Sequence, residues 1–165
     1  MLIRFILLAL GCPFFVLQDL SIKEKKFYKM LDHMLLHSVQ EISIHELKQN
    51  QDVILLDARE LAEYEVSKID EARWVGYDDF DFERISDISK DQEVIVYCSI
   101  GYRSEKIAER LKKEGFKNVK NLYGGIFSWV NNDKKVVDSL GQETNKVHAY
   151  NLIWGVWLDK GEKVY

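Results

Sequence analysis

Two short runs constrain the fold most strongly, because they are apolar at every position rather than at alternate positions. The first run, Val53–Leu56, ends at Asp57, and the second run, Val94–Tyr97, ends at Cys98. Strands that are buried on both faces have this pattern, which is typical of parallel sheets covered by helices. We therefore expect two central strands whose carboxyl ends carry a carboxylate and a thiol.

Helical patterns alternate with strand-like runs along the middle of the chain. Besides the two central strands, we expect helices at 60–66, 104–113 and 126–130, and short strands at 72–75 and 118–122. This alternation predicts an α/β fold, in which a mostly parallel central sheet is flanked by helices on both faces. Ligands of such sheets bind beyond the carboxyl ends of the strands, so Asp57 and Cys98 are expected to share one mouth.

The chain of 165 residues has room for one domain with appendages. We expect a spacer helix at 18–37, the domain at 38–132 and an aromatic-rich extension at 133–165. Ser43 and Glu46 have the spacing of a capping box and predict a short helix that ends near Asn50. The extension is expected to bury its rings against the domain, and a lip for a partner or substrate is the open alternative.

Residues 1–17 combine one positive charge with a long apolar stretch. This pattern predicts a signal peptide or an N-terminal anchor, because a membrane-spanning helix needs roughly twenty apolar residues. Export to the periplasm or cell envelope of a bacterium is the favoured interpretation, and a cytoplasmic location is the alternative. The sequence Ala9–Cys12 resembles a lipoprotein processing site, so membrane attachment through a lipid on Cys12 is also open.

Composition excludes several classes of partner. Acidic side chains number 27 and basic ones 23, and no basic run could follow a phosphate backbone, so nucleic acid is not an expected partner. Cys12 and Cys98 cannot build a disulfide framework, and Cys98 is expected to be a free thiol. His33 and His37 lie one helical turn apart, but no third ligand accompanies them, so we expect neither a metal nor another cofactor.

The segment after the second central strand is the candidate place for thiol chemistry. Cys98 is followed by a loop that leads into a helical pattern, and the loop residues are Ser99, Ile100, Gly101, Tyr102, Arg103 and Ser104. A strand that runs through a loop into a helix aims backbone N–H groups and the positive end of the helix dipole at the loop, which favours a thiolate. We expect Gly101 to let the loop curl and the N–H groups of residues 99–103 to surround the sulfur.

Two side chains of this loop have two predicted roles each. Arg103 is expected either to pair with a carboxylate that fixes the loop or to attract an anionic donor. Ser104 is expected either to cap the helix or to offer its hydroxyl to the anion. No histidine is close to Cys98 in the sequence, so nothing local supports a cysteine–histidine dyad.

Four motifs, in this order, resemble those of the rhodanese homology domain over about residues 38–132. They are Asp57-Ala58-Arg59, Glu63-Tyr64, the Cys98–Ser104 loop and Leu122–Trp129. The resemblance implies a sulfurtransferase, in which Cys98 takes a sulfane sulfur from a small donor anion such as thiosulfate, carries it as a persulfide and passes it to cyanide or a thiol. Asp57 and Arg59 are expected to support the site. A non-catalytic binding module and a persulfide sensor are the alternatives.

Loop length and one divergent segment bear on the chemistry. Four residues separate Cys98 from Arg103, whereas phosphatases with a related cradle have one residue more, so the smaller ring favours sulfur over phosphate esters.

Residues 67–72 read Ser-Lys-Ile-Asp-Glu-Ala, where rhodaneses commonly carry Gly-His-Ile-x-Gly-Ala. This segment borders the entrance of the family's active site, so the substrate preference stays open. Lys68 could supply a positive charge in place of the histidine, but a solvated lysine is the simpler interpretation.

Overall fold

The computed structural model describes residues 21–47 and 52–165. The predicted signal or anchor at 1–17, with Cys12, lies outside these residues, as does the predicted helix end near Asn50. In the two described ranges, no helix is long and apolar enough to cross a membrane.

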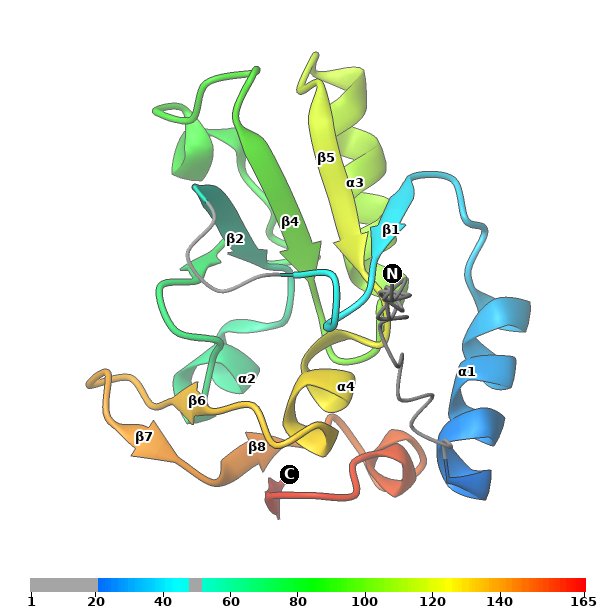
Figure 1. Ribbon diagram of the computed structural model, residues 1–165. Coiled ribbons are helices and arrows are strands. Elements are labelled where there is room, and N and C mark those ends of the chain that lie inside the picture. The colour runs from blue at the N-terminus through cyan, green and yellow to red at the C-terminus, as the bar shows by residue number, and fades with distance from the viewer. Residues whose placement is uncertain (1–20, 48–51) are drawn as a thin grey trace, which may run out of the picture.

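The centre of the molecule is a sheet of five parallel strands in the order β1-β5-β4-β2-β3. The strands are β1 (Gln40–Ile42), β2 (Val53–Asp57), β3 (Arg73–Trp74), β4 (Glu93–Tyr97) and β5 (Asn118–Leu122). In the centre, β4 pairs with β2 along its whole length, so that Asp57 lies opposite Tyr97. Both apolar runs are therefore central strands, and the predicted α/β fold with a parallel sheet is confirmed (Figure 1).

The side chains of β4 point alternately into two apolar clusters, one on each face of the sheet. Val94 and Val96 belong to a cluster that includes residues of α3. Ile95 and Tyr97 belong to a second cluster that includes residues of α1 and α4. Burial on both faces explains why the run is apolar throughout, and it confirms helices on both faces of the sheet. These helices are α1 (Ile22–Met34), α3 (Tyr102–Lys113) and α4 (Gly125–Asn131).

Three short segments differ from the prediction. The prediction omits β1, because only Ile42 of its three residues is buried and so short a pattern is not recognisable. At Ser43 the capping-box hydrogen bonds with Glu46 are both present, but the chain makes a turn rather than a helix over 44–47. A 3-10 helix, η1 (Phe82–Ile85), lies in the acidic connection, where no element is predicted.

The helix expected as a spacer packs against the domain. Phe27 and Leu31 of α1 are buried in the same cluster as α4. The rings of Tyr28 and Tyr123 stack beside them, with centroids 5.6 Å apart. Burying two large apolar side chains contributes about 3–6 kcal/mol, which fixes α1 in place beside the carboxyl end of the sheet.

The C-terminal extension covers the end of the sheet at which the strands terminate (Figure 1). Its β8 lies against α2 (Leu61–Val66). Val147 and Leu158 are fully buried, whereas Tyr150 and Tyr165 are exposed, as are Leu140, Leu152, Ile153 and Val156, so the extension packs only part of its apolar side chains against the domain. Its elements are β6 (Val136–Val137), β7 (Glu143–Thr144), β8 (Lys146–His148), η2 (Trp154–Trp157) and β9 (Glu162–Val164).

Candidate active site

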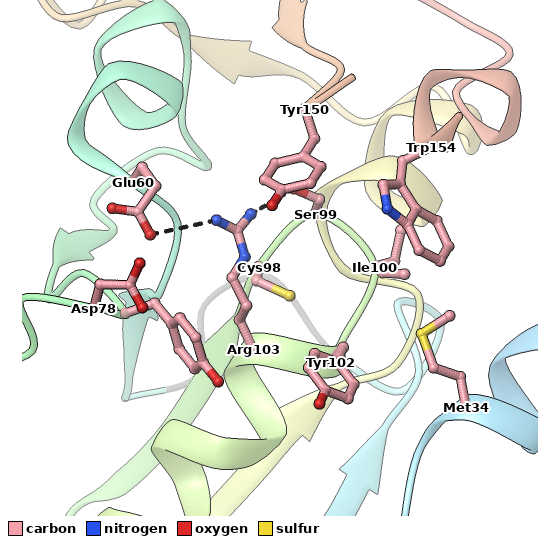
Figure 2. A pocket seen from close by; sticks show the side chains of 11 residues that line it. Met34, Glu60, Asp78, Cys98, Ser99, Ile100, Tyr102, Arg103, Tyr150 and Trp154 are labelled. Carbon is pink, nitrogen blue, oxygen red and sulfur yellow. Dashed lines mark hydrogen bonds and ion pairs between the residues drawn. The ribbon is translucent and has the colours of Figure 1, made fainter. Parts of the chain in front are cut away.

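Cys98 lies between the end of β4 and the start of α3, where it borders a cavity of about 380 Å³. Only 1% of the residue is exposed, but Sγ points toward the cavity (Figure 2). The N–H of Gly101 donates a hydrogen bond to Sγ at 3.1 Å. Within residues 21–47 and 52–165 this is the only hydrogen bond to the sulfur, so one of the five predicted loop amides contacts it directly.

The loop reverses direction at Gly101. This residue has a φ of +117° and is the N-cap of α3, which begins at Tyr102, two residues earlier than predicted. The first N–H groups of a helix have no acceptor within it, and the helix dipole is positive at the same end. An anionic sulfur on Cys98 therefore lies at the end of α3 that stabilises negative charge.

The amino end of α4 packs directly against the loop. Ile126 N donates to Cys98 O at 2.9 Å. Gly124 and Gly125 have φ values of +80° and +54°, and a Cβ at Gly125 would lie only 2.3 Å from Cys98 O. Positive backbone angles and the close approach to the neighbouring loop both favour glycine here.

Ser104 has neither of its predicted roles. Its Oγ lies 3.1 Å from Gly101 O and 2.7 Å from Asn121 Oδ1, and the side chain is fully buried. Gly101 already occupies the N-cap, so Ser104 falls in the first turn of α3 and faces β5 instead of the cavity. Asn121 Nδ2 also donates to Gly101 O at 3.0 Å. The prediction misses Asn121, although a polar residue in a buried strand is the signal that could have found it.

Arg103 forms a bidentate ion pair with Glu63 of α2. Its Nη1 and Nη2 donate to the two carboxylate oxygens at 2.6 and 2.9 Å, and Glu63 is only 2% exposed. Ser99 Oγ completes the cluster, at 2.9 Å from both Glu63 Oε1 and Arg103 Nη2. Pairing with a carboxylate is thus the role in which the structure places Arg103. Glu63 belongs to the recognised motif, but its role follows only from this contact.

Burial and ion pairing shift the pKa values of Glu63 and Arg103 in opposite directions. Burial raises the pKa of Glu63, but the hydrogen bonds and the charge of Arg103 outweigh it and hold this pKa below its usual value. Burial likewise lowers the pKa of Arg103, and pairing with Glu63 more than reverses that effect. Both groups stay charged at neutral pH, and together they tie the loop to α2.

Two further carboxylates lie at the mouth of the cavity. Glu60 Oε1 is 3.7 Å from Arg103 Nη1, and Asp78 approaches from the connection that follows β3 (Figure 2). Burial raises the pKa of Glu60; Arg103 lowers it, but repulsion by Asp78 and Glu63 raises it further, so the net pKa lies above its usual value. Of the described residues that line the cavity, Arg103 alone is positively charged.

Asp57 and Arg59 form a fully buried ion pair that does not line the cavity. Arg59 N and Nε donate to Asp57 Oδ1 at 3.0 and 2.9 Å, and Nη2 donates to Oδ2 and to Ser67 O at 2.6 Å each. Burial lowers the pKa of Arg59, and the charge of Asp57 more than reverses this. The pair connects the end of β2 to the residue that follows α2, and it does so without contacting the cavity.

The divergent segment 67–72 attaches the extension to the domain. Lys68 exchanges both backbone hydrogen bonds with Val137 of β6, and Lys68 Nζ donates to Asp138 O at 2.9 Å. Lys68 therefore supplies no charge to the cavity. Glu71 stands where the family commonly has its second glycine, and it keeps the left-handed backbone with a φ of +61°.

Met34, Tyr150 and Trp154 line the cavity from segments outside the loop, and we call these three residues the roof. Met34 comes from the end of α1, and the two aromatic residues come from the extension (Figure 2). The ring centroid of Tyr150 lies 5.0 Å from Arg103 Cζ, a cation–π contact. The extension thus contributes to the cavity wall as well as packing on the domain, which corresponds to the lip considered as the alternative.

His148 of β8 is the histidine that the fold brings toward the ion-pair cluster. Its Nδ1 accepts the N–H of Tyr150 at 3.1 Å. Burial lowers the pKa of His148, and of the nearby charges Glu63 opposes this shift while Arg59 and Arg103 add to it. His148 does not line the cavity, so its contact positions Tyr150 rather than touching the sulfur.

The two histidines considered as metal ligands lie apart from the site. His33 Nδ1 bonds Lys29 O within α1, and His37 lies beyond the end of that helix and pairs with Glu41. In residues 21–47 and 52–165, no group of three or more histidine, cysteine or acidic side chains has a geometry suited to a metal ion.

A sequence model of the rhodanese-like domain matches residues 43–132, more than half of the chain. This chain belongs to the rhodanese-like domain family. A sulfurtransferase of Allochromatium vinosum is 34% identical over 103 residues, which make up 60% of this chain and 95% of that protein. A Bacillus subtilis protein named as a candidate sulfur carrier is 33% identical over 96 residues, 56% of this chain, but the chain spans only 51% of its length.

Solved structures share the fold of the matched region. A rhodanese-related protein of Thermoplasma volcanium superposes with a TM-score of 0.53 at 27% sequence identity. The superposition covers 59% of this chain and 97% of that protein. The family match ends at residue 132 and begins at residue 43, so all three roof residues lie outside it.

Proposed function

We propose that this protein is a sulfurtransferase that carries a sulfane sulfur on Cys98 as a persulfide. The observation that carries the proposal is the position of Cys98 Sγ, which accepts the Gly101 N–H at the amino end of α3 and borders the cavity. A persulfide has its negative charge on the outer sulfur, and backbone amides stabilise such a charge without a metal. Family membership and a relative named sulfurtransferase support the same chemistry.

Sulfur transfer takes two displacement steps, and neither step needs an oxidant or a reductant. The Cys98 thiolate attacks the sulfane sulfur of a donor such as thiosulfate, a new S–S bond forms, the S–S bond of the donor breaks, and sulfite leaves with the electron pair. Cyanide or a thiolate then attacks the outer sulfur of the persulfide, and Cys98 leaves as a thiolate with its electron pair. Arg103 and Glu63 keep the loop in the conformation that both steps require.

Mass spectrometry and a thiocyanate assay test the proposal. The purified protein, incubated with thiosulfate or with methanethiosulfonate, should gain the mass of one sulfur atom on Cys98, and added cyanide should convert that sulfur to thiocyanate. Cys98→Ser is the matched control and should do neither. Persulfide formation without turnover would favour a persulfide sensor, and no persulfide with either donor would favour a binding module; both results would overturn the proposal.

We further propose that residues 1–17 direct the chain to the cell envelope of a bacterium, where they are cleaved or carry a lipid on Cys12. The support is the apolar stretch that follows a single positive charge. Fractionation of cells that express the tagged full-length chain should recover it in the periplasm or the membrane. Recovery at full mass in the cytosol alone would contradict this location.

A further inference from the structure

The cavity beside Cys98 has walls that suit an organic molecule. Its volume of about 380 Å³ lies within the range of about 300–1,000 Å³ that is typical of sites for small organic ligands. A small inorganic anion needs neither this volume nor an aromatic wall. The apolar and aromatic side chains that line the cavity are Met34, Tyr77, Ile100, Tyr102, Tyr150 and Trp154.

The charges around the cavity disfavour a dianion. Arg103 is the one cation among the described lining residues, and both of its Nη atoms donate to Glu63. Glu60 lies 3.7 Å from the same guanidinium, and Asp78 lines the mouth without an ion pair to any residue of the described ranges. Among these side chains, one positive charge is set against three carboxylates, which repel a doubly charged anion most strongly at low ionic strength.

The roof is held in position by specific contacts. Tyr150 has a φ of +64°, a left-handed conformation that a non-glycine residue keeps only where its surroundings determine it. Its N–H is bonded to His148 Nδ1, and its ring lies over Arg103. Trp154 begins η2 of the extension, and Figure 2 shows its indole at the edge of the cavity.

We propose that the site takes its sulfur from an organic donor that has an aromatic or apolar body and at most one negative charge, in preference to thiosulfate. This inference rests on the proposed function, because it names the donor class for the persulfide on Cys98. The thiolate attacks the sulfane sulfur of an organic thiosulfonate, the new S–S bond forms on Cys98, the S–S bond of the donor breaks, and a sulfinate leaves with the electron pair. Tyr150 and Trp154 contact the organic body, and Glu60 and Asp78 oppose a second negative charge.

Three donors separate the contribution of the body from that of the charge. Thiosulfate carries two negative charges, methanethiosulfonate carries one with a small body, and benzenethiosulfonate carries one with an aromatic body. Cyanide serves as the common acceptor, and each kcat/KM is divided by the rate of the same donor with a free thiol, which removes intrinsic reactivity. The normalised values should rise from thiosulfate through methanethiosulfonate to benzenethiosulfonate, with about a 3- to 10-fold gain from the ring.

Matched variants assign the preference to named residues. Tyr150→Ala and Trp154→Ala should each lower the ratio of benzenethiosulfonate to methanethiosulfonate about 3- to 10-fold. Ile153→Ala is the control, because Ile153 precedes Trp154 but is 73% exposed and does not line the cavity. Glu60→Gln and Asp78→Asn should raise kcat/KM for thiosulfate more than for benzenethiosulfonate, whereas Glu65→Gln, an exposed position of the same helix as Glu63, should change neither.

The outcomes distinguish this inference from the proposed function. A normalised ratio of benzenethiosulfonate to methanethiosulfonate near one, or a ratio that both roof variants leave unchanged, overturns the inference while thiocyanate still forms. A normalised value for thiosulfate equal to or above that of the thiosulfonates overturns it as well. Absence of the Cys98 persulfide with all three donors is instead a failure of the proposed function.

Discussion

The loop Cys98–Arg103 and the roof line the same cavity, but they are stabilised in different ways. The loop is enclosed by buried polar contacts, which run from Arg103 to Glu63 and from Gly101 to Asn121. The roof belongs to segments outside the family match, and its Tyr150 is 46% exposed. The contrast shows that buried polar contacts fix the loop that carries the sulfur, whereas more exposed segments form other walls of the cavity. Under our proposal these walls select the donor.

The largest expected effect comes from breaking the buried network of the loop. Glu63→Gln removes the charge opposite Arg103, so we expect the free energy of unfolding to fall by about 3 kcal/mol. Tyr150→Phe, in the roof, is the control and should change stability by less than about 0.5 kcal/mol, because no hydrogen bond of its hydroxyl is present in the described structure. Urea denaturation measures both values. Similar losses for the two variants would show that the ion pair does not stabilise the loop more than the roof.

Disrupting the contact between α4 and the loop should lower the free energy of unfolding nearly as much. Gly125→Ala places a Cβ 2.3 Å from Cys98 O, so we expect a loss of about 1–3 kcal/mol in the free energy of unfolding, together with lower turnover. Gly141→Ala is the matched control, because Gly141 also has a positive φ, of +76°, but nothing lies within 4 Å of a Cβ there. The difference between the two variants isolates the close approach, and equal losses would contradict it.

Lowering the pH should release Tyr150 of the roof from His148 before it affects the ion pair of the loop. The pKa of His148 is lowered in the folded state from its usual value of 6.5, so the unfolded chain binds the proton more readily. Stability linked to His148 is therefore complete above about pH 6.5 and decreases as the pH falls from there toward the lowered pKa. A protonated Nδ1 also cannot accept the N–H of Tyr150.

A donor-preference profile against pH measures this effect. The ratio of benzenethiosulfonate to methanethiosulfonate should fall in the wild type as the pH decreases from 6.5 toward the lowered pKa of His148. It should stay constant in His148→Asn, whose amide oxygen can accept the same N–H without titrating. Glu63 loses its charge only further down, below the usual carboxyl range, because its pKa is lowered too. Parallel profiles for the two proteins would argue against His148 as the positioning residue.

The smallest expected effect is a gain in stability at Glu71, in the segment through which the domain contacts the extension. Glu71 keeps a φ of +61° at a position where the family commonly has glycine, so Glu71→Gly should raise the free energy of unfolding by roughly 0.5–1 kcal/mol. Asp70→Gly, at the exposed neighbouring position with an ordinary φ, should lower it. Thermal unfolding of both variants gives the comparison, and a loss at Glu71 would show that its side chain matters more than its backbone angle.

The buried elements of the domain were predictable from the sequence, and of its shortest elements only β3, within the predicted strand at 72–75, was found. β4 reads as an apolar run because both of its faces are covered, and β5 is predicted with its observed bounds, Asn118–Leu122. β1 escapes prediction because three residues with one buried side chain carry too little pattern. The turn at Ser43 shows a different limit, since a correct capping box does not ensure that a helix follows.

For the candidate site, local patterns identified the candidate cysteine and missed residues that contact its loop from other elements. Cys98, Gly101 and the glycine pair before α4 follow from a strand–loop–helix pattern of neighbouring residues. Asn121 and Glu63 were found only through contacts, because each lies many positions away from the loop residue that it bonds. Ser104 was assigned to a cap because its position within the first turn depends on where α3 actually begins.

The sequence by itself determined the parallel α/β sheet and the place of a single cysteine at the end of its central strand, because burial on both faces and a sharp turn into a helix are local constraints. Only the tertiary structure decided that Arg103 pairs with Glu63, that Met34 of α1 and Trp154 of the extension line the same cavity, and that Glu60 and Asp78 line it as well. These features depend on segments far apart in the chain, and their mutual distances arise from the packing of α1 and the extension around the sheet.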